Sequence, residues 1–395
     1  MFMKRSKKVK NVLFTIVLSL TGLCLLLAGI SALSNLGLPQ QPAVVVETLG
    51  EADKIRLAEM FHLRQSVGEE VWPGWGQAKI PAIVYNESYA FLVGYPDPPD
   101  SWVKVPQNIQ RGGPWEAVSN DTFNGQHYYH QSLPDPDITP EGFTVLVGKR
   151  WVSSLQTYDA ARFGLIQTIR QDLPPFFRPI FPYRLFVGQL LGGSDKYITL
   201  SLHESFHAYQ GMLAPEKLAS SENINREYDH QYPWDDVSLQ ADWQIELDLL
   251  AEALQTADQN QTVELARRFI EVRATRRDSA KLTPELIAYE QQREWLEGLA
   301  RYAELEIWRQ AFTGEYSPVP ETASLPDFDN FTGFETRWSQ EIDQMRRMAD
   351  DEGDGRFYYS GMAQAYLLDR LMPNWKLNAF EEEFRLDDFL REVLK

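Results

Sequence analysis

Two histidines and a glutamate in the middle of the chain have the spacing of a metal-binding motif. Residues 203–207 read His-Glu-Ser-Phe-His, an H-E-x-x-H pattern. Residues four apart lie on one face of a helix, one turn apart, so His203 and His207 can reach the same ion. Glu204 projects beside them, where its carboxylate can take a proton from an attacking water. These residue types in this order predict hydrolysis assisted by Zn²⁺.

The sequence around the motif predicts a buried helix. Ser194 or Asp195 can cap its start, and Pro215 lies beyond its end. Between positions 197 and 209, Glu204 is the only charged residue apart from the histidines. A buried carboxylate needs a partner, which a metal supplies. The alternative is a buried helix with two structural histidines.

The third ligand must come from elsewhere, because a catalytic zinc site takes three protein ligands and keeps one position open. The best candidate is the helical run 294–304, Glu-Trp-Leu-Glu-Gly-Leu-Ala-Arg-Tyr-Ala-Glu. Glu297 and Glu304 are seven apart and therefore lie on one face. Gly298 keeps the surface beside Glu297 small, which allows another helix to approach closely. His230, in a Tyr-Asp-His sequence, is the rival ligand.

These two motifs together resemble the gluzincins, the thermolysin-like metallopeptidases with H-E-x-x-H and a distant glutamate ligand. The run around Glu297 looks most like the N-E-G-x-A pattern of the aminopeptidase N branch. The resemblance implies a zincin-like catalytic domain, Zn²⁺ as cofactor and a peptide or protein substrate. It makes Glu297 the third ligand and Glu304 the carboxylate that orients a ligand histidine. Leu296 stands where that branch has Asn, and the branch's G-x-M-E-N motif is absent, so aminopeptidase specificity is not implied.

A tyrosine pair opens a later apolar helix. Residues 357–361 read Phe-Tyr-Tyr-Ser-Gly, which resembles the Y-x-K-G pattern of the same branch. By its spacing to Gly361, Tyr358 matches the tyrosine that donates a hydrogen bond to the oxyanion, and Ser360 replaces the lysine. Tyr359 is a rival for this role. In the alternative interpretation both tyrosines serve only packing.

The composition limits the partners of the protein. The chain has 395 residues and a net charge of −18, and it is 44% hydrophobic. Such an acidic surface argues against binding nucleic acid and against docking on anionic lipid. The one cysteine, Cys24, lies in an apolar N-terminal stretch, so the rest of the chain has neither disulfides nor cysteine ligands for zinc.

The N-terminal sequence predicts a membrane anchor. Residues 11–46 contain no charged residue, and five basic residues precede them between positions 4 and 10. About 20 apolar residues span a bilayer as a helix. The positive-inside rule holds the basic end in the cytoplasm and sends the remainder outside. A cleaved secretory signal, with cleavage at Ala32, is the alternative, and it also exports the bulk of the chain.

Strands are predicted early and helices late, which is typical of an α+β fold with a small mixed or antiparallel sheet. The predicted parts are a cytoplasmic basic segment at 1–10, a transmembrane anchor at 11–32, a linker at 33–50, a β-containing part at 51–192 and a helical catalytic part at 193–395.

Local patterns predict the individual elements. Apolar spacing with a helical period predicts helices at 51–68, 160–171, 237–257, 262–276, 284–312, 335–348, 357–371 and 379–394. Runs rich in β-branched, aromatic or other apolar residues predict strands at 80–85, 89–95, 126–130, 143–152 and 184–191. No helix is predicted in the polar stretch that follows Pro215.

The sequence as a whole predicts a membrane-anchored, extracytoplasmic zinc metallopeptidase that hydrolyses peptide bonds. Two other functions stay open: a non-catalytic binding or scaffold protein on a gluzincin-like fold, and a hydrolase of a non-peptide amide. The presence of Glu204 counts against a scaffold, because a purely structural zinc site does not need that carboxylate.

Overall fold

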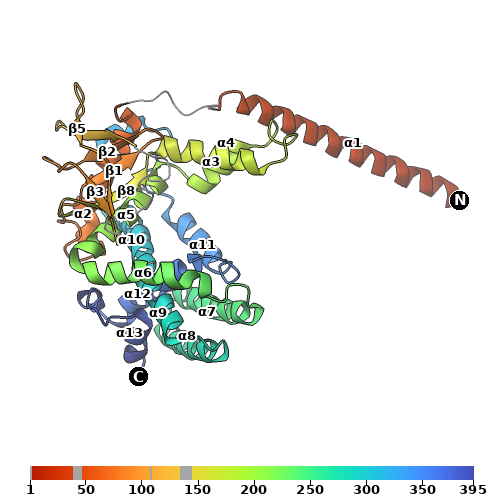
Figure 1. The fold of residues 1–395 in the computed structure, drawn as a ribbon. Coiled ribbons are helices and arrows are strands. Elements are labelled where there is room, and N and C mark those ends of the chain that lie inside the picture. Colours follow the sequence, from red (N-terminus) through yellow and green to blue (C-terminus); the bar gives the residue numbers. More distant parts are fainter. Residues whose placement is uncertain (1, 39–46, 107–108, 134–144) are drawn as a thin grey trace. The chain divides into compact units, whose positions relative to one another are not determined.

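A computed structural model of the chain describes residues 2–38, 47–106, 109–133 and 145–395 (Figure 1). The chain forms two compact units. The first combines Met1–Val46 with Thr157–Gly193, and the second combines Glu47–Gln156 with Ser194–Lys395. The fold is α+β, as predicted. The strands and the later helices lie in the second unit.

The first unit contains the N-terminal helix α1 (Phe2–Asn35) and two shorter helices, α3 (Tyr158–Asp172) and α4 (Tyr183–Leu191). The stretch Leu18–Asn35 of α1 is long and apolar enough to cross a membrane, a property that signal sequences share. A small core of Leu38, Ile166, Tyr183 and Val187 holds the unit together.

The prediction of a strand at 184–191 is wrong, because this segment belongs to the helix α4. Tyr183 and Val187, four residues apart, are buried, whereas Leu185 and Phe186 between them are exposed. That pattern has the period of a helix. A short apolar run without polar alternation does not by itself distinguish a strand from a helix.

The second unit contains an eight-stranded sheet in the order β4-β3-β7-β8-β1-β2-β6-β5. Neighbouring strands are antiparallel except β1 and β8, which are parallel. The strands are β1 (Ala82–Tyr85), β2 (Tyr89–Val93), β3 (Trp102–Lys104), β4 (Ile109–Arg111), β5 (Glu116–Ala117), β6 (Tyr129–Ser132), β7 (Val145–Val147) and β8 (Arg150–Gln156).

The strand predictions agree with this sheet in most places. The segments predicted at 80–85 and 89–95 are the antiparallel pair β1 and β2. The single strand predicted at 143–152 is a hairpin of β7 and β8, because Gly148 has a φ of +60° and turns the chain. Residues 143 and 144 lie outside the described residues. The strand predicted at 126–130 begins later, at Tyr129.

Helices make up most of the second unit. They are α2 (Glu51–Val71), α5 (Ser194–Leu213), α6 (Pro215–Tyr228), α7 (Val237–Gln255), α8 (Gln259–Ser279), α9 (Pro284–Arg293), α10 (Leu299–Thr313), α11 (Phe334–Met345), α12 (Gly355–Leu371) and α13 (Leu386–Val393), together with short 3₁₀ turns. A π-helical turn, η3 (Glu294–Gly298), joins α9 to α10.

Three helix predictions need correction. The polar stretch after Pro215 forms α6, because the proline starts the helix and Leu218 and Ser221, three residues apart, are buried on one side. The helix predicted at 284–312 is interrupted by η3. The helix predicted at 379–394 is limited to α13.

The predicted motif helix is α5, and nearly all of its residues are buried. It packs against β8, α2 and α10 (Figure 1). Its start is fixed by Asp195, whose carboxylate accepts hydrogen bonds from the backbone N–H groups of Asp329 at 2.7 Å and Phe331 at 2.5 Å. Its apolar side includes Phe206, whose ring lies 5.1 Å from that of Trp72. The sheet and α10 thereby hold the two histidines in fixed positions.

The helices η3 and α12 touch backbone to backbone at two glycines. A Cβ atom on Gly298 would lie 2.5 Å from Cα of Gly361, and one on Gly361 would lie 2.5 Å from the carbonyl oxygen of Glu294. Only residues without side chains allow this approach. The contact brings the start of α12 beside the turn that carries Glu297.

We expect Gly361→Ala to destabilise the protein. Its methyl group must displace backbone atoms of η3, which costs about 1–3 kcal/mol for comparable overpacking. Urea unfolding followed by circular dichroism should show a lower midpoint than wild type. Gly333→Ala is the control, since its Cβ would meet nothing within 4 Å. Equal midpoints for the two variants would contradict the close contact.

Candidate metal centre

The three predicted ligands come together in the second unit. His203 and His207 of α5 and Glu297 of η3 are all buried. The two Nε2 atoms are 3.1 Å apart, and Oε2 of Glu297 lies 3.3 Å from His203 Nε2 and 3.2 Å from His207 Nε2. The three atoms therefore form a small, nearly equilateral triangle.

The hydrogen bonds of Gln210 define the tautomer of His207. The amide nitrogen of Gln210 donates to the carbonyl oxygens of Trp295 at 3.0 Å and Leu296 at 3.2 Å. Its oxygen therefore faces Nδ1 of His207, at 2.8 Å. Because an amide oxygen can only accept, Nδ1 carries the proton and Nε2 of His207 has a free lone pair.

The carboxylate of Glu304 influences the tautomer of His203 in a similar way. Nδ1 of His203 lies 3.5 Å from Oε2 of Glu304. The same oxygen accepts a 2.6 Å hydrogen bond from Arg301, so Glu304 is ionised and has only lone pairs to offer. The negative charge of Glu304 favours the tautomer of neutral His203 with its proton on Nδ1, although this nitrogen makes no hydrogen bond within the described residues. Glu304 thus occupies the place predicted for the residue that orients a ligand histidine.

The triangle fits a zinc ion. With both histidines neutral, three lone pairs meet with no proton between them, which is unfavourable without a cation. A tetrahedral zinc with ligands at about 2.0–2.1 Å has neighbouring ligand atoms about 3.3 Å apart. The separations of 3.1–3.3 Å match this value. Two imidazoles and one carboxylate also form a ligand set common in zinc hydrolases.

The local field favours positive charge at this point. Burial lowers the pKa of His203, but the nearby carboxylates of Glu297 and Glu304 outweigh burial and raise the pKa to about 10. Burial raises the pKa of Glu297, but His207 and Arg293 hold it well below its usual range. Either a proton or a metal ion satisfies this demand for a cation.

A buried arginine fixes the orientation of the Glu297 carboxylate. Arg293, one turn earlier, donates from Nη2 to Oε1 of Glu297 at 2.8 Å. The other oxygen is left facing the histidines. Arg293 also pairs with Asp354 at the start of α12, and its Nη1 lies 3.7 Å from Glu222 of α6. One guanidinium group thereby connects η3 with two neighbouring helices.

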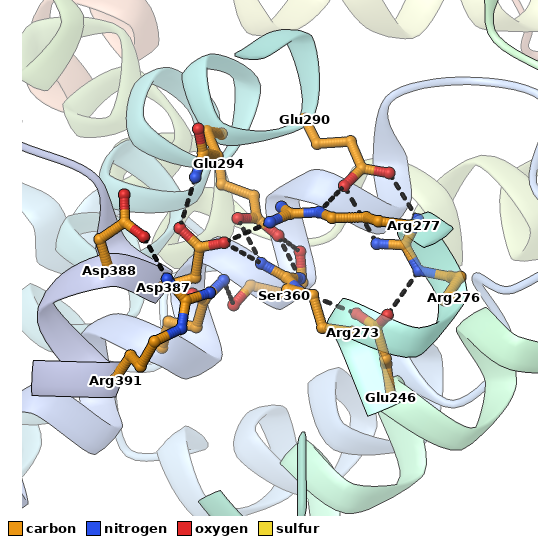
Figure 2. A network of polar contacts seen from close by, with 12 residues as sticks. Glu246, Arg273, Arg276, Arg277, Glu290, Glu294, Ser360, Asp387, Asp388 and Arg391 are labelled. Carbon is orange, nitrogen blue, oxygen red and sulfur yellow. Dashed lines mark hydrogen bonds and ion pairs between the residues drawn. The ribbon is translucent and has the colours of Figure 1, made fainter. Parts of the chain in front are cut away.

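The turn that carries Glu297 is held by a buried network of ion pairs that includes Glu294 (Figure 2). Arg273 of α8 donates to both oxygens of Glu294, at 2.8 and 2.6 Å. Ser360 donates to the same carboxylate at 2.5 Å. Arg276 holds Glu290 of α9 at 2.5 Å. Since Glu290 and Glu294 lie on either side of the junction between α9 and η3, the network fixes the position of this turn.

The remaining members of this network extend it to other helices. Glu246 of α7 bridges Arg273 at 3.0 Å and Arg276 at 2.5 Å. Arg277 joins Glu290 at 2.8 Å to Asp387 of α13 at 2.6 Å. Unpaired charges would be costly at such depth, but here each guanidinium group has carboxylate partners.

Glu204 differs from the other buried acids. Its Oε2 atom has no hydrogen-bond partner in the described part of the chain, although the residue is only 8% exposed. Burial raises the pKa of Glu204, with His207 and His203 opposing the shift. A carboxylate oxygen left without a partner beside the ligand triangle is available to a water or a substrate.

Glu204 faces a cavity of about 310 Å³, at the lower end of the roughly 300–1,000 Å³ typical of small-ligand sites. The triangle opens onto this cavity through His207 and Glu297. Its lining combines apolar and charged side chains: Val105, Glu204, His207, Leu218, Glu222, Asn225, Arg293, Leu296, Glu297, Asp354 and Tyr358.

The two candidate tyrosines have different surroundings. The ring of Tyr358 stacks on His203, with centroids 5.8 Å apart and an angle of 8° between the planes, and it lines the cavity. Tyr359 is turned away, and its hydroxyl donates to Glu341 at 3.0 Å. Tyr358 is therefore the tyrosine that lies beside the ligand triangle. Tyr359 lies next to Arg301, in the surroundings of Glu304.

The rival ligand His230 lies in a 3₁₀ turn after α6 and is not part of the ligand cluster.

Some important residues at the site were not predicted. Gln210 could have been found, since it lies seven residues after His203 on the same helical face. Arg293 precedes Glu297 by one turn, a spacing typical of ion pairs. No local signal marks Asp354 or Glu222.

No protein-family model, curated protein or solved structure matches the chain. The resemblance to gluzincins therefore depends on the sequence motifs alone.

We expect the full-length protein, purified in detergent, to bind close to one zinc ion per chain. His203→Ala, His207→Ala and Glu297→Ala should each lower the zinc content measured by mass spectrometry, because the ion then keeps only two protein ligands. His230→Ala is the control and should keep the wild-type content. Full zinc content in Glu297→Ala would show that the third ligand is a different residue.

Proposed function

We propose that this protein is a zinc-dependent metallopeptidase of the gluzincin type that cleaves peptide bonds. The observation that carries the proposal is the arrangement of three converging lone pairs next to Glu204, a buried carboxylate with an unpartnered oxygen. A structural zinc site needs only ligands, whereas a hydrolytic site also needs a base and room for a substrate. Glu204 and the adjacent cavity supply both.

His203, His207 and Glu297 would hold the Zn²⁺ ion. When bound, zinc polarises the scissile carbonyl and makes water more acidic. Glu204 accepts the proton of the attacking water and passes it to the leaving amine. Because its Oε2 has no partner within the described residues, this oxygen does not have to give up another interaction first.

Tyr358 is the proposed donor to the oxyanion. It lines the cavity beside the ligands, and a hydroxyl in that place can stabilise negative charge on the former carbonyl oxygen. Gln210, Glu304 and Arg293 have positioning roles. Each holds one ligand residue so that its free lone pair points toward the ion.

We also propose that α1 anchors the protein in a membrane with its basic end in the cytoplasm. Its apolar stretch and the preceding basic residues support this orientation. The site would then act outside the cytoplasm, on peptides or proteins of that compartment. Secretion after cleavage of α1 as a signal leads to the same compartment.

We expect Glu204→Gln to retain zinc and lose activity. Glutamine keeps the size of the side chain but cannot accept the proton. Cleavage of a fluorogenic peptide library should therefore fall by at least roughly 10²- to 10⁴-fold, the usual cost of losing a general base. Zinc content and thermal stability should stay near wild type.

The matched control for this experiment is Glu216→Gln, on the exposed side of α6. It should cleave the library at the wild-type rate. If Glu204→Gln is as active as this control, the proposed mechanism is wrong, whatever the zinc content.

A second comparison separates the two tyrosines. We expect Tyr358→Phe to bind zinc normally and to lower the cleavage rate by up to about 10²- to 10³-fold, the range for removing one oxyanion donor. Tyr359→Phe should have a much smaller effect on the rate, since its hydroxyl is bound to Glu341. A larger loss of rate in Tyr359→Phe would reverse the two roles.

A further inference from the structure

The first unit exposes an unusual number of large apolar side chains. We call residues 174–191, the turn before α4 and α4 itself, the apolar flap. Its exposed large apolar residues are Phe176, Phe177, Ile180, Leu185, Phe186 and Leu190. Phe176 is 68% exposed and Leu185 is 60% exposed. Scattered apolar residues are normal on a protein surface, but a group of this size on one short segment indicates a binding surface.

The apolar flap is attached to the end of the apolar helix α1. The side-chain nitrogen of Asn35 donates to the carbonyl oxygens of Phe181 at 2.8 Å and Pro179 at 3.1 Å. Nε of Arg184 donates to the carbonyl oxygen of Ser34 at 3.1 Å. These bonds hold the flap at the last turn of α1, within the same compact unit.

The length of α1 places this junction at the surface of a bilayer. If the basic residues up to Lys10 stay in the cytoplasm, the next 20 residues of a helix cover the hydrocarbon core of about 30 Å. Ser34 and Asn35 then lie about 6–8 Å beyond the core. The headgroup region on each side is about 5–7 Å thick, so the flap is attached at its level.

The charge of this region suits such a location. Residues 157–193 contain the four arginines 162, 170, 178 and 184 but only two aspartates, 159 and 172. The chain as a whole has a net charge of −18 and was therefore not expected to dock on anionic lipid. The uneven distribution of charge makes this segment an exception, since local positive charge is attracted to anionic headgroups.

We propose that the apolar flap is a second membrane contact, with its exposed side chains inserted into the outer leaflet next to α1. This inference rests on the proposed anchoring of α1. Tyr183 and Val187 face the core of the unit, while Leu185, Phe186 and Leu190 face the lipid. Apolar side chains that a helix exposes at the membrane surface become buried at the boundary between headgroups and acyl chains. The flap thus fixes the depth and tilt of the first unit at the membrane.

The test uses spin labels on the full chain in nanodiscs of phosphatidylcholine with phosphatidylglycerol. Cys24→Ser removes the one native cysteine. In this background Leu185→Cys and Leu190→Cys place labels on the flap, and Leu26→Cys places one within α1. Val237→Cys is the matched control, an exposed apolar position in the second unit. Paramagnetic relaxation by oxygen, which enters lipid, is compared with relaxation by a polar nickel chelate.

We expect the ratio of oxygen to nickel relaxation at positions 185 and 190 to be shifted toward oxygen, relative to position 237. Nickel relaxation at the flap equal to that at position 237 would overturn the inference. Protection of the flap from both reagents would also overturn it, and would indicate a second copy of the chain or another protein segment as the occupant.

Position 26 separates the two proposals. A lipid-exposed label at position 26 together with water-exposed labels on the flap leaves the anchor intact and refutes only the flap contact. A water-exposed label at position 26 refutes both. Peptide cleavage by the same samples reports separately on the proposed enzymatic function.

Discussion

At the candidate metal centre, three lone pairs point toward one another and would repel without a cation between them. His203, His207 and Glu297 bring these atoms within 3.3 Å in a buried place. The surrounding residues prevent the triangle from relaxing. Gln210 accepts a hydrogen bond from Nδ1 of His207, and Arg293 donates to Oε1 of Glu297. The folded chain therefore presents a preformed demand for positive charge, which is the usual basis of tight metal binding.

The buried ion pairs next to the site explain how a group of charged side chains that favours a bound cation can exist in the protein interior. Burying charges is costly, and it becomes acceptable only when each charge has partners with good geometry. Arg273 and Arg276 satisfy this condition, because both form ion pairs with carboxylates, those of Glu246, Glu290 and Glu294. Because the carboxylates come from neighbouring helical segments, their pairing fixes the π-helical turn. Turns of this kind are often found at functional sites, where they shift one side chain out of the regular helical register.

Several elements could be predicted from sequence because their causes are local. The motif helix, the strand pair β1 and β2 and most late helices follow from side-chain periodicity and from residues that start or end a helix. The errors share a different cause. Segment 184–191 is too short for its periodicity to distinguish a strand from a helix. The helix α6 has few apolar residues, so its buried side is not recognisable in a mostly polar sequence. In both cases contacts with the rest of the fold decided the structure.

The sequence by itself determined that His203 and His207 share one face, because four residues make about one helical turn. It also marked Glu297 and the tyrosine pair as candidates. Only the tertiary structure brought Glu297 to the histidines, through contacts between segments far apart in sequence. It also placed Tyr358 rather than Tyr359 beside His203. Adjacent residues on a helix point about 100° apart, and which of them faces a site depends on how the whole helix is packed.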